Sequence, residues 1–228
     1  MNEPITRREV LRAMAGLAVS AAAVGCGDGR DANPVEVPAC VLTPSQIQGP
    51  FFFDTGLLRR DITEGRPGIP LRIQLRLASV SEVSCEPLRG ALVEAWHADA
   101  EGVYSGYDRA QGNLRDASGS TFLRGYQVSD DDGVVEFSTI YPGWYPGRAI
   151  HIHLIVQPDA ARRLTTQLYF PEAVNDDVFA RSPYDARGAR DTTNATDLLV
   201  GPSLDDLAWT VTRSGNGYVA RHAIGLAT

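Results

Sequence analysis

A thirteen-residue stretch that ends in two histidines carries the densest group of side chains able to do chemistry. It runs from Tyr141 to His153 with the sequence YPGWYPGRAIHIH. The branched apolar residues around the histidines predict a strand. Because side chains alternate along a strand, His151 and His153 share one face with their Cβ atoms about 6.5 Å apart, a spacing from which two imidazoles can bind one ion. Only four histidines occur in the chain, and two of them lie here.

Two further reactive groups precede the histidines. Prolines and glycines at positions 142–147 preset a tight loop that carries Tyr145 and Arg148. A phenol, a guanidinium and two imidazoles are therefore expected close together. Taken singly, each has a plainer interpretation as a packed tyrosine, a solvated arginine or a surface histidine pair. Their joint occurrence favours a metal site.

A second tyrosine follows another predicted strand, at residues 91–97. This strand ends at Trp96 and His97, and the turn at 99–102 then places Tyr104 at the rim of the sheet. His97 is left out of the site, because the residue beside a core tryptophan on an alternating strand points the other way. Tyr104 could instead be a rim aromatic residue that packs on the core.

The segments that must position these groups are predicted to be strands. Apolar and polar side chains alternate over residues 71–77, which predicts a half-buried antiparallel strand. Similar segments recur at 91–97, 122–128, 133–140, 149–156, 164–170, 207–213 and 218–224. No long helical period and no internal repeat are present. The sequence therefore predicts an all-β fold, an antiparallel β-sandwich with long active-site loops.

Two segments depart from this pattern. Residues 43–53 (TPSQIQGPFFF) end in three aromatic residues and are expected to plug the core rather than to form a site. Residues 171–206 are long, polar and rich in turn residues, with at most short helical turns expected. Loops of this length in a compact domain are usually functional or disordered. The acidic turn at 130–133 is interpreted as a hairpin turn, since no twelve-residue calcium loop follows it.

The first residues are interpreted as an export signal. A twin-arginine pattern, Arg7 and Arg8, precedes a mildly apolar run that is too short to span a bilayer permanently. Residues 1–25 are expected to be the signal peptide, with Cys26 as a lipid anchor; cleavage nearby with a soluble product is the alternative. Residues 26–39 have the composition of a tether. Residues 40–228 are expected to form one domain in a periplasmic or other extracytoplasmic location.

Charge and cysteine content narrow the classes of function. The net charge is −7 with no basic run, which argues against nucleic-acid binding. Cys40 and Cys85 form an even pair in an exported chain, so a disulfide is predicted. A zinc site built from thiols would need more cysteines or a CxxC spacing.

Three stretches together resemble the intradiol ring-cleavage dioxygenases, the group that contains the protocatechuate and catechol dioxygenases. They are GALVEAWHADAEGVYSG, DDDGVVEFSTIYPGWYPGRAIHIH and TTQLYF. The resemblance implies a non-haem Fe(III), or Fe(3+), with four ligands: Tyr104, Tyr145, His151 and His153. It implies that Arg148 and Gln167 line the substrate, a small aromatic diol that O2 opens to a muconate-type diacid. Tyr145 would leave the iron as a base, and Arg148 would stabilise negative charge on the ring.

The resemblance also has limits. Only Pro146 and Gly147 separate the second tyrosine from Arg148, where better-known members have a longer loop, so the tolerated ring substituents stay open. The short segment before Thr43 leaves no room for the helical dimerisation region of catechol dioxygenases. A monomer or weak dimer of an exported, single-domain subgroup is therefore expected.

Two other classes of function stay open. One is an exported β-sandwich binding module that recognises an aromatic or carbohydrate ligand without catalysis; a shared fold alone does not exclude it. The complete set of ligands with Arg148 and Gln167 argues for the enzyme. The other is a zinc hydrolase built on His151 and His153, which would need a third ligand such as a nearby carboxylate. The neighbouring sequence offers tyrosines instead.

Overall fold

The computed structural model describes residues 41–82 and 84–227. The predicted signal peptide (1–25), the tether (26–39) and the lipid-anchor Cys26 lie outside the described residues. Cys40 lies outside them as well, so its disulfide with Cys85 stays a prediction. Within the described ranges, no helix is both long and apolar enough to cross a membrane.

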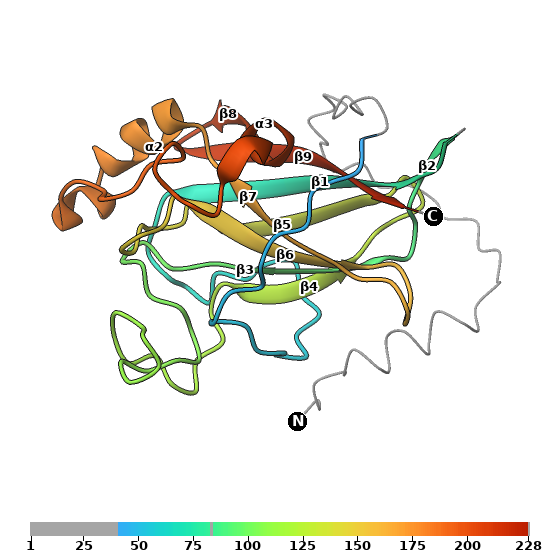
Figure 1. The fold of residues 1–228 in the computed structure, drawn as a ribbon. Helices are drawn as coiled ribbons and strands as arrows, with labels where there is room; N and C mark the ends of the chain where they lie inside the picture. Colours follow the sequence, from blue (N-terminus) through green and yellow to red (C-terminus); the bar gives the residue numbers. More distant parts are fainter. Residues whose placement is uncertain (1–40, 83, 228) are drawn as a thin grey trace.

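Two sheets stacked face to face form the fold (Figure 1). The first sheet contains β1 (Pro70–Val80), β2 (Cys85–Pro87), β5 (Val134–Ile140), β8 (Thr210–Ser214) and β9 (Gly217–Ala227). The second has the order β4 (Arg124–Val128), β3 (Leu92–Trp96), β6 (His151–Gln157) and β7 (Leu164–Tyr169). The predicted all-β sandwich is confirmed, and each of the eight predicted strands overlaps a strand of the structure.

The strand predictions were incomplete in three places. The three-residue strand β2 was not predicted. β1 pairs antiparallel with β5, as expected, but it also pairs parallel with β9 on its other edge. The strand predicted at 207–213 begins only at Thr210, because the residues before it form the short helix α3 (Leu204–Leu207).

The core lies between the two sheets. The alternating residues of β1 behave as predicted: the apolar set is buried, and the intervening Arg72, Gln74 and Arg76 are partly exposed. Ile152 and Leu154 of β6 belong to the same core, where burying one such side chain contributes about 1.5–3 kcal/mol. The histidines that alternate with them must therefore face away from the core.

The segment between β7 and β8 is more helical than predicted. It contains α2 (Glu172–Phe179), η1 (Tyr184–Arg187), η2 (Gly201–Ser203) and α3. The eight-residue helix α2 exceeds the short turns expected from sequence. Tertiary contacts account for it, because Arg190 forms ion pairs with Glu172 and Asp176 of this helix, each at 2.6 Å. The segment lies at the same end of the sandwich as the loop after β3 (Figure 1).

His97 lies just after β3, is fully buried and stays outside the site, as predicted. The predicted orientation was wrong, because Trp96 lies on the outer face against His153 and His97 lies on the core side. Its Nε2 atom is 2.8 Å from Thr139 Oγ1, and its Nδ1 atom is 2.8 Å from the carbonyl oxygen of Ala98. Burial lowers the pKa of His97 to about 4, whereas a histidine in an unfolded chain has a pKa of about 6.5. Between these values the unfolded chain binds the proton and the folded chain does not, so stability falls as the pH drops through this window.

Replacing this histidine should therefore reduce the acid sensitivity of the fold. Both proteins should become less stable between pH 7 and pH 4. We expect the drop in the free energy of unfolding to be about 3 kcal/mol smaller in His97→Gln than in the unmodified chain. Denaturant titrations at the two pH values measure the difference. Equal losses in both proteins would contradict the assignment of a buried neutral imidazole to His97.

Candidate active site

The two histidines of β6 lie on the outer face of the second sheet and are flanked by residues of both neighbouring strands. His153 pairs with Trp96 of β3 and with Gln167 of β7, and His151 pairs with Tyr169 of β7. The Trp96 ring stacks on the imidazole of His153, with the centroids 4.8 Å apart and 7° between the planes. Sheet pairing therefore fixes both imidazoles from the two sides.

The two tyrosines arrive on loops whose backbones touch. Gly143 donates a hydrogen bond to the carbonyl oxygen of Asp99 at 2.9 Å. A Cβ atom at Gly143 would lie 2.4 Å from that oxygen, so only glycine fits there. The Asp99 carboxylate accepts from the backbone N–H of Val103 at 3.0 Å and closes the turn that precedes Tyr104. One backbone contact thus places Tyr104 relative to Tyr145.

Four donor atoms converge at this point. The Nε2 atom of His151 lies 3.0 Å from Nε2 of His153, 3.1 Å from Oη of Tyr145 and 3.5 Å from Oη of Tyr104. The two phenol oxygens are 3.4 Å apart. Tyr104, His151 and His153 are all buried. The four ligands expected from the sequence therefore form one cluster.

Burial sets the protonation of these donors. It lowers the pKa of both imidazoles well below the ordinary histidine value, so both stay neutral. Nδ1 of His151 lies 2.7 Å from the carbonyl oxygen of Ala149, which can only accept, so the proton is on Nδ1 and Nε2 keeps its lone pair. Burial also raises the pKa of Tyr104 and of Tyr145. A nearby cation is needed to remove those phenol protons.

The donor set fits a single, highly charged cation. Donors about 2.0–2.1 Å from an ion lie about 2.9 Å apart at a right angle and about 3.4 Å apart at a tetrahedral angle. The observed separations of 3.0–3.5 Å match this range. Phenolates are hard anionic donors that suit a trivalent ion. Among the described residues, no three His, Cys, Asp or Glu side chains are grouped to hold a metal, so this site depends on its tyrosines.

A guanidinium borders the donor cluster. Nη1 of Arg148 lies 3.5 Å from Oη of Tyr145. Nη2 donates to Oε1 of Gln167 at 2.5 Å and lies 3.4 Å from Oη of Tyr169. The amide nitrogen of Gln167 in turn donates to the carbonyl oxygen of Ile47 at 2.7 Å. The structure thus brings together all six site residues named from the sequence.

The sequence interpretation missed two aromatic residues of this site. Phe51 was expected to plug the core rather than to form a site. It is indeed buried in a small apolar cluster, but this cluster includes Tyr104 and so borders the site. Hydrogen bonds from Gln46 to Thr165 and from Gln167 to Ile47 hold its segment along β7. The Phe51 ring consequently stacks on Tyr104, with the centroids 4.7 Å apart.

Tyr169 was the second omission. A signal for it was present in the sequence, because Tyr169 lies two residues after Gln167 and shares its face of β7. Its phenol is buried in the sheet, which raises its pKa to about 12. Tyr169 is therefore a neutral hydrogen-bonding neighbour of Arg148.

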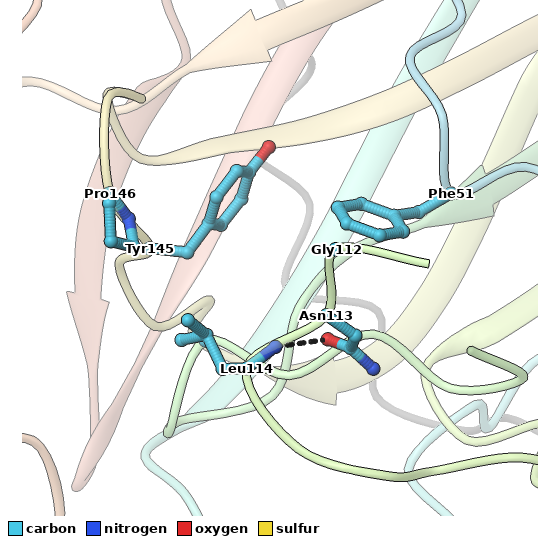
Figure 2. Close-up of a pocket in the computed structure, with 7 residues that line it drawn as sticks. Phe51, Gly112, Asn113, Leu114, Tyr145 and Pro146 are labelled. Carbon is cyan, nitrogen blue, oxygen red and sulfur yellow. Dashed lines mark hydrogen bonds between the residues drawn. The ribbon is translucent and has the colours of Figure 1, made fainter. Parts of the chain in front are cut away.

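A pocket of about 160 Å³ opens beside the donor cluster (Figure 2). Its lining residues are Phe51, Gly102, Gly112, Asn113, Leu114, Tyr145 and Pro146. Figure 2 shows the rings of Phe51 and Tyr145 on opposite sides of it. The side-chain amide of Asn113 is already hydrogen-bonded to the backbone. Its oxygen accepts from the N–H groups of Tyr104 and Leu114, and its nitrogen donates to the carbonyl oxygen of Tyr104. A cavity of about 150 Å³ holds a benzene ring, so this pocket suits one aromatic ring.

Comparison with known proteins identifies a family that matches most of the described chain. A family model described as Dioxygenase matches residues 47–196. Catechol 1,2-dioxygenase 1 from Acinetobacter lwoffii is 31% identical over 148 residues, which cover 55% of this chain and 45% of that protein. Chlorocatechol 1,2-dioxygenase from Rhodococcus opacus is 33% identical over 154 residues, 56% of each chain. The chain thus spans about half the length of the curated relatives it matches.

Solved structures cover more of the chain. An intradiol ring-cleavage dioxygenase from Tetranychus urticae gives a TM-score of 0.73 at 29% identity, over 82% of this chain and 94% of that one. A second match is the dioxygenase domain of a dioxygenase and carbohydrate-binding protein fusion from Streptomyces sp. SirexAA-E. It gives a TM-score of 0.62 at 31% identity and covers 82% of this chain and 99% of that one. The chain belongs to the intradiol ring-cleavage dioxygenase family.

Proposed function

We propose that this chain is a non-haem Fe(III)-dependent dioxygenase that opens the ring of a catechol-type diol with O2 and releases a muconate-type diacid. The observation that carries the proposal is the convergence of two phenols and two neutral imidazoles within 3.5 Å, next to Arg148. A ring-sized pocket adjoins these donors. Relatives named as catechol and chlorocatechol dioxygenases support the same substrate class.

The metal ligands would be Tyr104, Tyr145, His151 and His153. A bound Fe(III) would act as a Lewis acid that withdraws electron density from the bound diol. We assign the proton-accepting role to Oη of Tyr145, because this tyrosine is the donor that lines the pocket. Tyr104 would stay in place, since the Asn113 side chain holds its backbone N–H and C=O at 3.1 and 2.7 Å.

Two polar residues would act on the substrate rather than on the metal. Nη1 of Arg148 points at the donor cluster, where it would stabilise negative charge that develops on the ring during attack by O2. Gln167 accepts from Nη2 of Arg148 and would keep this orientation. Phe51 and Leu114 supply apolar walls that exclude water from the pocket.

The test is chemical and spectroscopic. The iron-loaded protein should be burgundy to red, because tyrosinate-to-Fe(III) charge transfer absorbs visible light. With catechol it should consume one O2 per ring opened, without a reductant, and place both atoms of ¹⁸O2 in the diacid. A folded, colourless protein that contains zinc would overturn the metal assignment. Catechol binding without O2 uptake would instead support the binding module.

The pocket lining makes a prediction about substrate charge. None of its seven residues carries a charged side chain, and a carboxylate buried there without a cationic partner would lose its hydration. We expect kcat/KM for catechol to exceed that for a carboxylated catechol by at least about tenfold, which corresponds to about 1.4 kcal/mol. Steady-state O2 uptake with the two substrates measures the ratio. A preference for the carboxylated ring would contradict this picture of the pocket.

We further propose that the protein is exported and lipid-anchored at Cys26, and that it is a monomer or weak dimer. The arginine pair at positions 7 and 8 and the cysteine that follows the apolar run support export and anchoring. Cell fractionation of the full chain tests the location, and substitution of Cys26 by serine should move the protein from the membrane fraction to the soluble one.

A further inference from the structure

Asp197, in the segment between β7 and β8, is a buried carboxylate that contacts the edge of the site. Its side chain is only 1% exposed. Oδ2 accepts from Nε of Arg148 at 2.9 Å and from the backbone N–H of Ala149 at 2.8 Å. Oδ1 accepts from the backbone N–H of Leu199 at 2.8 Å. One carboxylate thus binds both the side chain and the backbone at the entry to β6.

These contacts determine the direction of the guanidinium. The group is planar, with its donors in a fixed fork. Asp197 binds the Nε edge, and Gln167 accepts from Nη2 at 2.5 Å. Because Nε and Nη2 are both held, the third nitrogen, Nη1, is directed at Oη of Tyr145 and Nε2 of His151, 3.5 Å from each. Without Asp197, the guanidinium could turn about its own stem.

The same carboxylate also reaches a predicted metal ligand. Ala149, whose N–H donates to Asp197, accepts through its carbonyl oxygen from Nδ1 of His151 at 2.7 Å. This second bond fixes the tautomer that leaves Nε2 of His151 free to bind an ion. Asp197 therefore supports both the charge-stabilising arginine and the residue that orients one imidazole.

We propose that Asp197 is a positioning residue of the ring-cleavage site, acting mainly through Arg148. The inference rests on the proposed function. It assigns a role to the segment 171–206, which would complete the site by supplying the counter-charge of the largely buried guanidinium, whose side chain is 14% exposed. Such a counter-charge matters because a buried cation that loses its partner is strongly destabilised.

The first test replaces the carboxylate with an amide of the same size. In Asp197→Asn we expect kcat to fall about tenfold to a hundredfold, the range typical for residues that support a metal or catalytic group. Catechol affinity should change less than about threefold, and the visible band should remain. In an Arg148→Ala background the same substitution should have little further effect, because the residue through which Asp197 acts is already gone.

Asp191 provides a matched control. It lies in the same segment and accepts from the backbone N–H of Gly147 at 3.2 Å, and the structure shows no bond from it to the guanidinium. Asp191→Asn should keep turnover within about twofold, because its hydrogen bonds to Gly147 and Thr192 do not involve the guanidinium. Asp197→Glu retains the charge and should recover part of the kcat that Asp197→Asn loses. If Asp197→Asn does not fold, Asp197→Glu takes its place in the comparison with the Arg148→Ala background.

The outcomes separate this inference from the proposed function. Absence of O2 uptake by the unmodified protein with catechol would overturn the function. The positioning role is then judged from crystal structures of the unmodified protein and Asp197→Asn, in which the Arg148 guanidinium should differ in orientation. An unchanged guanidinium, normal turnover in Asp197→Asn, or an equal loss with and without Arg148 would overturn the positioning role.

Discussion

Replacement of His153 by alanine is expected to remove the bound iron, bleach the visible colour and abolish ring cleavage. The imidazole supplies one of the four donors, with Nε2 at 3.0 Å from that of His151. Its removal leaves two phenols whose pKa burial raises, and these lose their protons only beside a well-held cation. Iron analysis, the visible spectrum and O2 uptake with catechol measure the three effects.

His97 is the matched control for this substitution. It is a buried histidine just after the neighbouring strand β3, but its ring bonds to Thr139 and Ala98 instead of pointing at the donor cluster. His97→Gln should therefore keep iron and colour. Circular dichroism establishes that both variants are folded. A His153→Ala protein that retains one iron per chain and its colour would refute the ligand assignment.

The part of the site on β6 was predictable because it depends on short-range geometry. Two-residue alternation places His151 and His153 on one face and Ile152 and Leu154 on the other, whatever the rest of the chain does. Alternation also predicted the buried face of β1. The tight loop before β6 added Tyr145 and Arg148 at a fixed distance along the chain.

Other parts of the site depend on contacts between distant segments. The segment 171–206 contains seven aspartates, and no periodicity distinguishes the buried Asp197 from the rest. Its burial follows from a tertiary contact with Arg148, 49 residues away along the chain. Phe51 enters the site because its segment bonds to β7, more than a hundred residues later. The parallel pairing of β1 with β9 is equally non-local.

Replacement of Arg148 by alanine should reduce kcat about a hundredfold to a thousandfold, the usual effect of losing one preorganised electrostatic group. Catechol affinity should change little, because the guanidinium is assigned to charge that develops only as O2 attacks the ring. Iron and colour should persist, since Arg148 is not a donor to the metal. O2 uptake and a spectroscopic titration with catechol separate kcat from binding.

Lysine should not restore the lost rate, for a reason specific to this site. Arg148 donates to Asp197 and Gln167 through different nitrogens while a third faces Tyr145, and a single ammonium cannot reproduce that fork. Arg190, which is 9% exposed and paired with Glu172 and Asp176, is the control arginine; Arg190→Ala should keep normal turnover per folded chain. If the chain were instead a binding module, Arg148→Ala would weaken catechol binding, and neither protein would consume O2. Near-normal kcat in Arg148→Ala, or loss of its iron, would contradict the role assigned to this residue.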